Sequence, residues 1–183
     1  ENIIGIGMAP FLMNMASCFI VILINKGLKL YDGDLAIGAF GIVNRIVYLF
    51  VMIVMGITMG MQPITGYNYG AQHFDRVKRT LKLGITAGCI ITTLGFTVGE
   101  LFPGVFVGMF TDNHELTEEA TLALQIGILA FPIVGPQIVI TQFFQSIGKA
   151  RISIFLSLSR QLLFLLPGLA FLPPFYGVEG VWF

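Results

Sequence analysis

Residues 120–148 read ATLALQIGILAFPIVGPQIVITQFFQSIG, a stretch without any Asp, Glu, Lys or Arg. Four other stretches are equally free of these residues, namely 2–25, 46–74, 83–99 and 161–178. A helix of about 20 predominantly apolar residues is long enough to cross the hydrocarbon core of a bilayer. The sequence therefore predicts an all-α polytopic membrane protein.

The composition supports the same class. Of the 183 residues, 56% are hydrophobic and 11% are charged, and the mean hydropathy is +0.87. A soluble globule of this size needs more charged side chains on its surface, and a disordered chain is far more polar. Ten Lys and Arg balance ten Asp and Glu. The net charge therefore identifies no partner, and a nucleic-acid partner is not expected.

The positions of the charges divide the chain into helical spans within a single transmembrane lobe, residues 1–183. The chain begins one residue before an apolar run and ends at the start of another, so it is interpreted as a fragment of a longer protein. The third span has an optional extension to residue 110. The predicted spans cover about 3–24, 35–61, 83–101, 120–147 and 152–172, and a truncated sixth starts near 178.

The Lys and Arg residues of short loops predict the orientation, because such loops are enriched in them on the cytoplasmic side. The connection 62–80 with its flank holds four, and the connection 148–151 holds two. The connections 25–34, 111–119 and 173–177 hold two, none and none. The first two connections are therefore predicted to be cytoplasmic and the other three extracytoplasmic, in a multi-pass protein of the cell membrane.

Two arginines lie inside predicted spans. Arg45 follows Asp34 by 11 residues, which places it ~16 Å into the membrane at 1.5 Å per residue. Arg160 follows Arg151 by nine residues, or ~13 Å from the other side. An ionisable residue at this depth is costly and commonly marks a substrate or ion pathway. The structural alternative is that each guanidinium binds helix-end carbonyls or extends along a cavity wall.

The fourth span contains two prolines and a polar stripe. Pro132 and Pro136 remove two backbone donors within about one helical turn. Broken membrane helices of this kind occur at the substrate sites of secondary transporters. Gln137, Thr141 and Gln145 follow at four-residue spacing on one helix face. They are predicted to line a substrate pathway, with hydrogen bonding between helices as the alternative.

Weaker candidates lie on the first two spans. Asn14 is a polar residue on the first span, and Met52 and Met55 lie on one face of the second. Flexible thioethers suit surfaces that bind varied ligands, although packing against lipid is the alternative. Three pairs of glycines have the spacing that allows close helix approach, namely Gly56 with Gly60, Gly66 with Gly70, and Gly104 with Gly108.

Catalytic motifs are missing from the sequence. It has no HExxH, no P-loop and no pair of carboxylates in the predicted membrane interior. His114, between Asp112 and Glu115, is a weak metal candidate. The chain is therefore predicted not to be an enzyme.

Residues 60–71, GMQPITGYNYGA, provide the strongest motif. They resemble the signature that follows the eighth helix of the MATE family of multidrug and toxin extrusion transporters. The basic stretch 76–82 and the segments 101–111, 143–149 and 177–182 are also similar to that family, so the resemblance covers essentially the whole chain. The matching motif residues are Gln62, Pro63, Gly66, Asn68, Gly70 and Ala71.

The resemblance implies the second six-helix half of a twelve-helix antiporter, with helices 7 to 12 and the last one truncated. Its partners would be the N-terminal lobe of the same chain, the lipid bilayer, and amphipathic cationic small molecules. Coupling would use a sodium or proton gradient without a bound cofactor. In the sodium-coupled branch, helices seven and ten of this lobe carry acids, yet residues 2–25 and 120–148 contain none. A coupling carboxylate is therefore expected in the first lobe.

Three other functions compete with this interpretation. A lipid-linked oligosaccharide flippase of the same superfamily would use Arg45 and Arg160 to bind a pyrophosphate, but the motif at residues 60–71 argues against it. An intramembrane enzyme lacks a nucleophile or metal set, and a channel is compatible with the composition alone.

Overall fold

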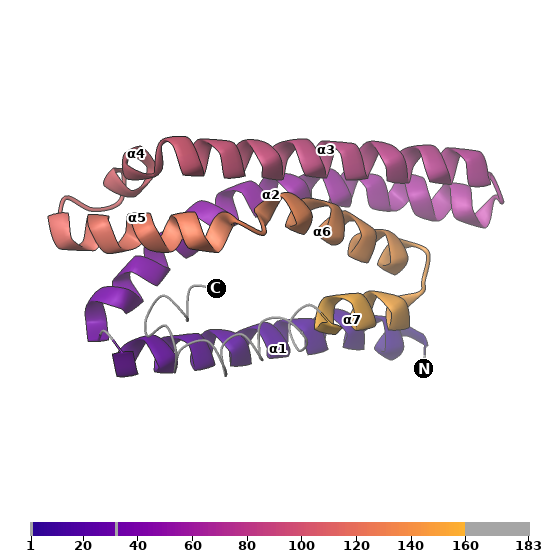
Figure 1. Ribbon diagram of the computed structural model, residues 1–183. Helices are drawn as coiled ribbons and strands as arrows, with labels where there is room; N and C mark the ends of the chain where they lie inside the picture. Colours follow the sequence, from indigo (N-terminus) through magenta and orange to yellow (C-terminus); the bar gives the residue numbers. More distant parts are fainter. Residues whose placement is uncertain (1, 32, 160–183) are drawn as a thin grey trace.

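The structure is a computed structural model, and it describes residues 2–31 and 33–159. Within these residues the chain forms helices and no strand. Short connections join the helices, so consecutive elements fold back on one another (Figure 1). The helices are α1 (Asn2–Tyr31), α2 (Gly33–Gly70), α3 (Phe74–Leu101), α4 (Pro103–Gly108), α5 (His114–Ile128), α6 (Phe131–Ser146) and α7 (Ala150–Ser159).

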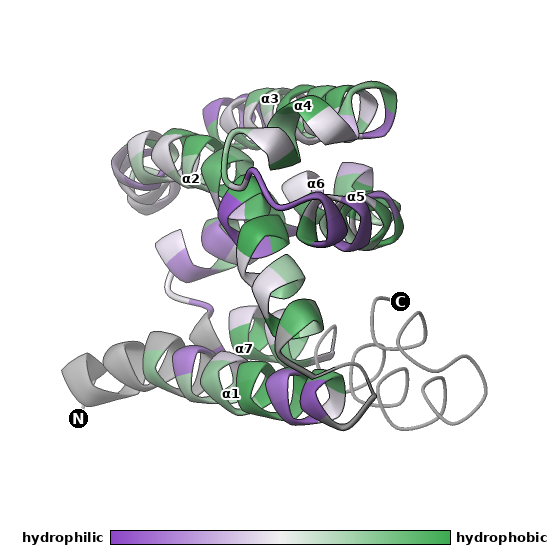
Figure 2. Cartoon of the chain, turned by 90° about the vertical axis from the view of Figure 1, so that its left-hand side faces the viewer, coloured by the Kyte–Doolittle hydropathy of each residue, from purple (hydrophilic) through white to green (hydrophobic). Residues whose placement is uncertain are grey.

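The helices form two layers. Helices α2, α3, α5 and α6 pack together, with the short α4 beside α5. Helices α1 and α7 lie side by side in the second layer, as both ribbon views show (Figures 1 and 2). The first layer meets α7 through α6, and it meets α1 through α2.

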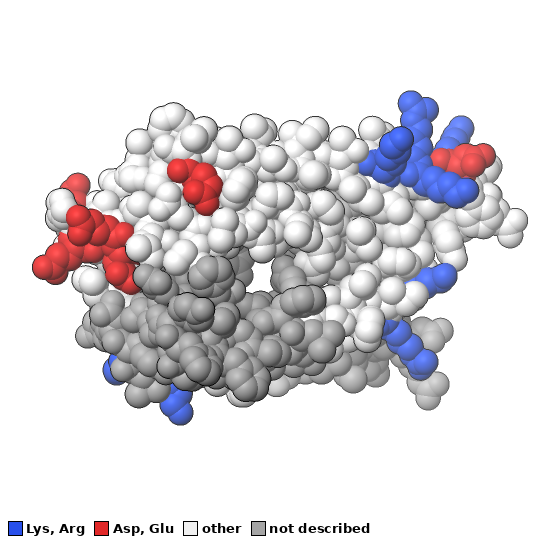
Figure 3. Space-filling view, in the orientation of Figure 1, with Lys and Arg blue, Asp and Glu red and all other residues white. Residues whose placement is uncertain are grey.

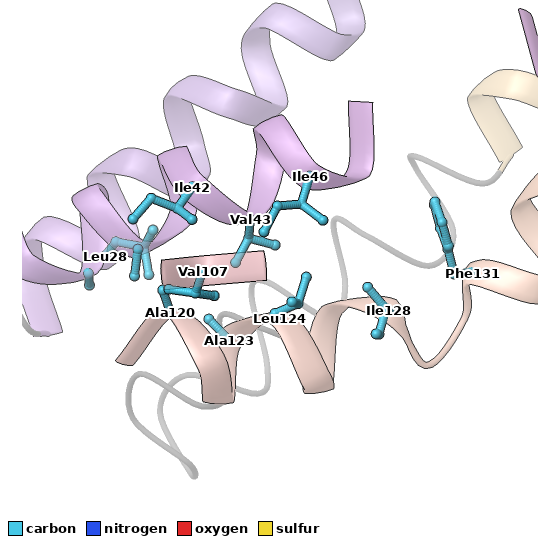
Figure 4. Packing of buried hydrophobic residues seen from close by; sticks show 12 residues of the cluster. Leu28, Ile42, Val43, Ile46, Val107, Ala120, Ala123, Leu124, Ile128 and Phe131 are labelled. Atoms are coloured by element: carbon cyan, nitrogen blue, oxygen red, sulfur yellow. The ribbon is translucent and has the colours of Figure 1, made fainter. Parts of the chain in front are cut away.

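An apolar core joins α2 to α5. Figure 4 shows Leu124 and Ile128 of α5 pointing toward Val43 and Ile46 of α2. Phe131, at the start of α6, closes one end of this cluster, and its ring meets Phe50 edge-on at 6.1 Å between centroids. The core therefore fixes the position of the α5–α6 junction relative to α2.

The helices extend beyond the apolar runs that predicted the spans. Helix α2 continues to Gly70, so the predicted connection 62–80 is helical except for residues 71–73. The predicted connection 25–34 is likewise largely helical, because α1 reaches Tyr31 and α2 begins at Gly33. Charged side chains mark where the apolar segment ends, whereas a helix ends only where the backbone leaves helical geometry. The sixth predicted span and the 173–177 connection lie outside the described residues.

The optional extension of the third span to residue 110 is not continuous with α3 in the structure. Phe102 leaves helical geometry with φ −134° and ψ 48°, and α4 starts separately at Pro103. A residue that precedes proline is driven out of the α region by steric contact with the proline ring. This restriction on Phe102 separates α3 from α4.

Length and composition alone allow two described helical segments to cross a membrane, Leu35–Gly70 and Phe74–Leu101. Helices α5 and α6 add a third crossing if they count together as one bent span. These segments form most of the first layer.

Close contact between α3 and α6 depends on glycines that the sequence analysis did not single out. A Cβ on Gly88 would lie 3.2 Å from the Gly135 carbonyl oxygen, and a Cβ on Gly135 would collide with the same region of α3. By contrast, the predicted pairs at 56 and 60 and at 104 and 108 have open space around them. No described residue therefore approaches these four glycines closely, because the described neighbours lie on other sides of these helices.

Candidate functional site

The predicted break in the fourth span is present, but it lies before the prolines. Helices α5 and α6 meet at an angle of 55°, at Leu129 and Ala130. Pro132 is in the first turn of α6, where a backbone N–H has no partner within the helix. Pro136 lies inside α6 and leaves the Pro132 carbonyl without a helical donor. The bend therefore positions α6 against α3 through Gly135.

The polar stripe of α6 faces a helix interface at its centre. Thr141 is buried, and its hydroxyl donates to the Gln137 carbonyl at 2.8 Å. The Ser153 hydroxyl of α7 donates to the Thr141 carbonyl at 2.9 Å. This side-chain bond links α6 to α7, which is the interhelical role given above as the alternative.

The two glutamines of the stripe are half-buried. The Oε1 atom of Gln137 is buried and has no hydrogen-bond partner within the described part of the chain. It lies next to Pro136, in the turn whose backbone bonding is already incomplete. Gln137 is therefore the stripe residue best able to accept a hydrogen bond from a bound molecule or from a neighbouring lobe.

A second group of candidates lies along one exposed face of α2. Arg45, Met52 and Met59 are spaced by seven residues, so they fall on the same side of the helix. Arg45 is exposed, 12 residues or ~18 Å from the start of α2. It forms no ion pair with any described residue. Met55 is exposed beside this row. We call Arg45, Met52, Met55 and Met59 the α2 face.

The remaining candidates are not brought to this face. Asn14 is exposed on α1, in the other layer. Arg160 lies outside the described residues. The small apolar cavity between α2, α3 and α5 is lined by core residues such as Phe50, Gly99 and Leu124, and by none of the predicted pathway residues. The candidates therefore form separate groups on α1, α2 and α6.

The motif at residues 60–71 forms the end of α2. Gln72 adopts a left-handed φ of 60°, and the His73 N–H donates to the Asn68 carbonyl at 2.9 Å. This bond and the one from the Gln72 N–H to the Tyr69 carbonyl form a Schellman end. A left-handed residue after the helix reverses the chain toward α3. Sequence reasoning identified the motif but not this turn, because the position is usually glycine.

The motif approaches α6 at Gly66. Gly66 lies close to its end, since a Cβ there would be 3.4 Å from the Ser146 carbonyl oxygen. Asn68 is buried and donates from Nδ2 to the Ile64 carbonyl at 2.8 Å. Pro63 lies within α2 and is exposed, Gln62 is half-buried, and Gly70 and Ala71 are exposed at the helix end. The motif thus provides a helix end and a close helix contact.

Acidic groups are sparse near these candidates. On α5, His114 Nδ1 lies 3.6 Å from Glu118 Oε1, and both side chains are exposed. The described residues include no group of three or more His, Cys, Asp or Glu that could hold a metal. The candidates on α2 and α6 offer polar, apolar and cationic groups for contact with a ligand.

The MatE family model matches residues 6–169 of this chain. The chain belongs to the MatE family. Relatives include the multidrug export proteins MepA of Staphylococcus aureus (strain MSSA476) and of Staphylococcus haemolyticus (strain JCSC1435). They are 28% and 26% identical to this chain, and each alignment covers 99% of it. The chain spans about 40% of the length of these MatE relatives.

Solved MATE transporters share the fold. The MATE multidrug transporter DinF-BH, whose structure was solved in complex with a ligand, is 35% identical, with a TM-score of 0.85 over 100% of this chain and 41% of that one. The bent form of Vibrio cholerae VcmN is 21% identical, with a TM-score of 0.82 over 96% of this chain and 39% of that one. The described helices therefore have the architecture of one lobe of a MATE membrane protein.

Proposed function

We propose that this chain is the second lobe of an ion-coupled antiporter that exports amphipathic, cationic small molecules from the cell. The observation that carries the proposal is that the family match extends along most of the chain and that its relatives include named multidrug exporters. The ligand complex of DinF-BH supports a small-molecule substrate. A first lobe, carried by the same longer chain, would complete the substrate cavity.

Within this lobe the α2 face is the best candidate surface for the cavity. It combines flexible apolar side chains, which adapt to varied ligands, with a single cationic group. Arg45 would set the electrostatic potential of the cavity, and Gln137 would offer an acceptor near the α5–α6 bend. Asn14 of α1 is a further candidate, as is Arg160, which lies outside the described residues.

The proposed orientation places the ends of α2 and α6 in the cytoplasm and the α4–α5 connection outside the cell membrane. It rests on the excess of Lys and Arg in the first turns of α3 and at the start of α7. No Asp or Glu occurs in residues 2–25 or 120–148. We therefore place the coupling carboxylate in the first lobe, with either sodium or protons as the driving ion.

Dye efflux tests the function. Cells that express the intact transporter should accumulate less ethidium than cells with an empty vector, and collapse of the driving gradient should abolish the difference. Separate collapse of the sodium and proton gradients would identify the ion. Unchanged ethidium accumulation together with transfer of a lipid-linked oligosaccharide would instead indicate the flippase.

Substitution of Arg45 tests the role of the α2 face. We expect Arg45→Ala to lower the ethidium export rate about tenfold, because it removes the one charge on that face. A tenfold change corresponds to ~1.4 kcal/mol. Arg45→Lys should retain most of the wild-type rate. Lys26→Ala is the matched control, since Lys26 is an exposed basic residue on α1. Wild-type export and expression in Arg45→Ala would refute the proposed role.

A further inference from the structure

Basic side chains gather at the end of the molecule where α2 turns into α3. Figure 3 shows a group of Lys and Arg at this end and a group of Asp and Glu at the opposite end. The first turns of α3 carry four exposed basic residues, Arg76, Lys78, Arg79 and Lys82. We call these four residues the basic collar. Asp75 is the one acid beside them, so a net charge of about three remains.

The collar lies on the side of α3 that faces away from the protein. Val77 is buried between its members, and the buried glycines of α3, beginning with Gly84, continue that inner face. The outer side continues as an exposed apolar row of Leu83, Ile90, Leu94 and Leu101. Beside this row, exposed Thr86 and Thr97 donate their hydroxyls to the backbone of their own helix, and the half-buried Glu100 lies at its far end. The row itself is apolar and exposed, which suits contact with lipid tails.

The dimensions of α3 place the collar beside the lipid headgroups. From Leu83 to Leu101 the helix rises ~27 Å, which is close to the ~30 Å hydrocarbon thickness of a bilayer. Lys82 and Arg76 lie ~1.5 Å and ~10 Å beyond Leu83 along the same helix. The headgroup layer is about 5–8 Å thick on each side. The four basic groups therefore span that layer.

Aromatic residues at the same end provide an independent indication of the interface. Tyr67 is 76% exposed near the end of α2, and Phe74 is 51% exposed at the start of α3. The ring of Phe74 meets that of Tyr69 edge-on at 6.0 Å between centroids. Exposed tyrosines are enriched at the level of lipid headgroups, where the ring is apolar and the hydroxyl is hydrated.

From these observations we infer that the basic collar binds the phosphate headgroups of anionic phospholipids in the adjacent leaflet. The apolar row holds the lipid tails, Tyr67 and Phe74 border the headgroup layer, and the four cations neutralise the phosphates. The opposite end of the described chain exposes Asp112, Glu115 and Glu118, which would repel the same lipids. Lys26 and Lys29 also lie near that end, but the acids outnumber them there. The described chain therefore favours anionic lipid at the collar end, and this preference is separate from export.

Lipid competition in nanodiscs tests the inference. The intact transporter is reconstituted with mixtures of phosphatidylglycerol and phosphatidylcholine, and a fluorescent phosphatidylglycerol reports its enrichment at the protein. Each basic residue near an anionic surface contributes about a fivefold effect on binding. We expect the combined Arg76→Gln, Lys78→Gln, Arg79→Gln and Lys82→Gln variant to reduce the enrichment by at least about tenfold. Raised ionic strength should reduce the wild-type enrichment as well.

Two control variants separate this site from general electrostatics. Lys26→Gln with Lys29→Gln removes two exposed basic residues near the opposite end, and it should leave the enrichment unchanged. Arg76→Lys with Arg79→Lys preserves the charge and should retain the enrichment. If the fourfold variant does not insert, the pairs Arg76→Gln with Lys78→Gln and Arg79→Gln with Lys82→Gln take its place, each with a smaller loss.

Three outcomes would overturn the inference. The first is equal phosphatidylglycerol enrichment in the wild type and in every collar variant. The second is an equal loss in the Lys26 and Lys29 control. The third is displacement of the lipid by inorganic phosphate at constant ionic strength, since that would assign the collar to a soluble anion rather than to the leaflet.

Discussion

Gly135 sits where the backbones of α3 and α6 come closest. A Cβ at this position would lie 2.5 Å from Thr92 Oγ1 and still nearer the Gly88 carbonyl oxygen. Thr92 is itself fixed, because it is buried and its hydroxyl donates to that carbonyl at 2.9 Å. A methyl group at 135 therefore has no flexible neighbour to displace.

We expect Gly135→Ala to destabilise the transporter by about 1–3 kcal/mol, the usual cost of overpacking. Gly56→Ala is the matched control, because nothing described lies within 4 Å of its Cβ and alanine is a better helix former. Thermal unfolding of the purified transporter in detergent measures both variants. An equal Tm for the two variants would show that α3 and α6 do not approach closely at this point.

The left-handed residues after α2 and α6 form another matched pair. Gln72 ends α2 with φ 60°, and Gly148 ends α6 with φ 77°. The left-handed conformation costs a residue with a side chain roughly 1–2 kcal/mol, whereas glycine adopts it freely. Gln72→Gly should therefore raise the Tm and Gly148→Ala should lower it. Shifts of the same sign in both variants would contradict these turn conformations.

Residue spacing alone did not predict which glycines meet a neighbouring helix. The spacing of Gly56 and Gly60 matches a close-contact motif, yet these glycines face open space in the described chain. The glycines of α3 that do meet α6 have the same spacing. Spacing places two residues on one face of a helix, but it does not tell which face meets a neighbour.

At the scale of the element, α6 contains two prolines in different helical contexts. Pro132 occupies the first turn, where its missing N–H has no partner to lose. Pro136 occupies the interior, where an alanine N–H could bond to the Pro132 carbonyl. The two positions therefore predict different effects for the same substitution.

We expect Pro136→Ala to stabilise α6, by up to ~3 kcal/mol if nothing else satisfies the Pro132 carbonyl. Pro132→Ala should change the Tm little, and the bend at Leu129 should remain. The two Tm values, compared with the ethidium export rate of each variant, show whether export needs the weakened turn. A larger stabilisation from Pro132→Ala than from Pro136→Ala would contradict the assigned positions.

The apolar runs of the sequence predicted the class of each element better than its ends. Helix α5 begins at His114, well before the predicted span at residue 120, because the Asn113 side chain accepts from the Glu115 N–H at 3.0 Å and caps the helix. Such a cap works equally well among charged residues. Hydropathy reports the environment of a helix, whereas capping and φ values report its ends.

At the scale of the whole molecule, the candidate pathway residues did not assemble into one cavity. Thr141 packs against α7, while the α2 face points away from the neighbouring helices. A pathway between two lobes presents its lining as an exposed face in either lobe alone. Sequence reasoning could name the polar residues, but their grouping depends on tertiary packing and, in the proposed transporter, on the first lobe.

The α2 face and the outer row of α3 have similar exposure in this chain but different expected environments. Met52 is 67% exposed on the face that carries Arg45, and Leu94 is 56% exposed in the uncharged row of α3. A cation at membrane depth needs water or a polar partner, so the α2 face should adjoin a hydrated cavity. The α3 row should remain in lipid. The thiol of a cysteine introduced there would not be deprotonated and would not react.

Cysteine labelling therefore separates the two environments. In an intact transporter whose native cysteines, including Cys18 and Cys89, are replaced, Met52→Cys should react with a water-soluble maleimide, and saturating ethidium should slow that reaction. Leu94→Cys should remain unlabelled under the same conditions, since the thiolate that reacts forms only where water reaches the sulfur. Ethidium should have no effect on the rate for Leu94→Cys. Equal labelling at both positions, or labelling of Met52→Cys that ethidium does not slow, would remove the α2 face from the substrate pathway.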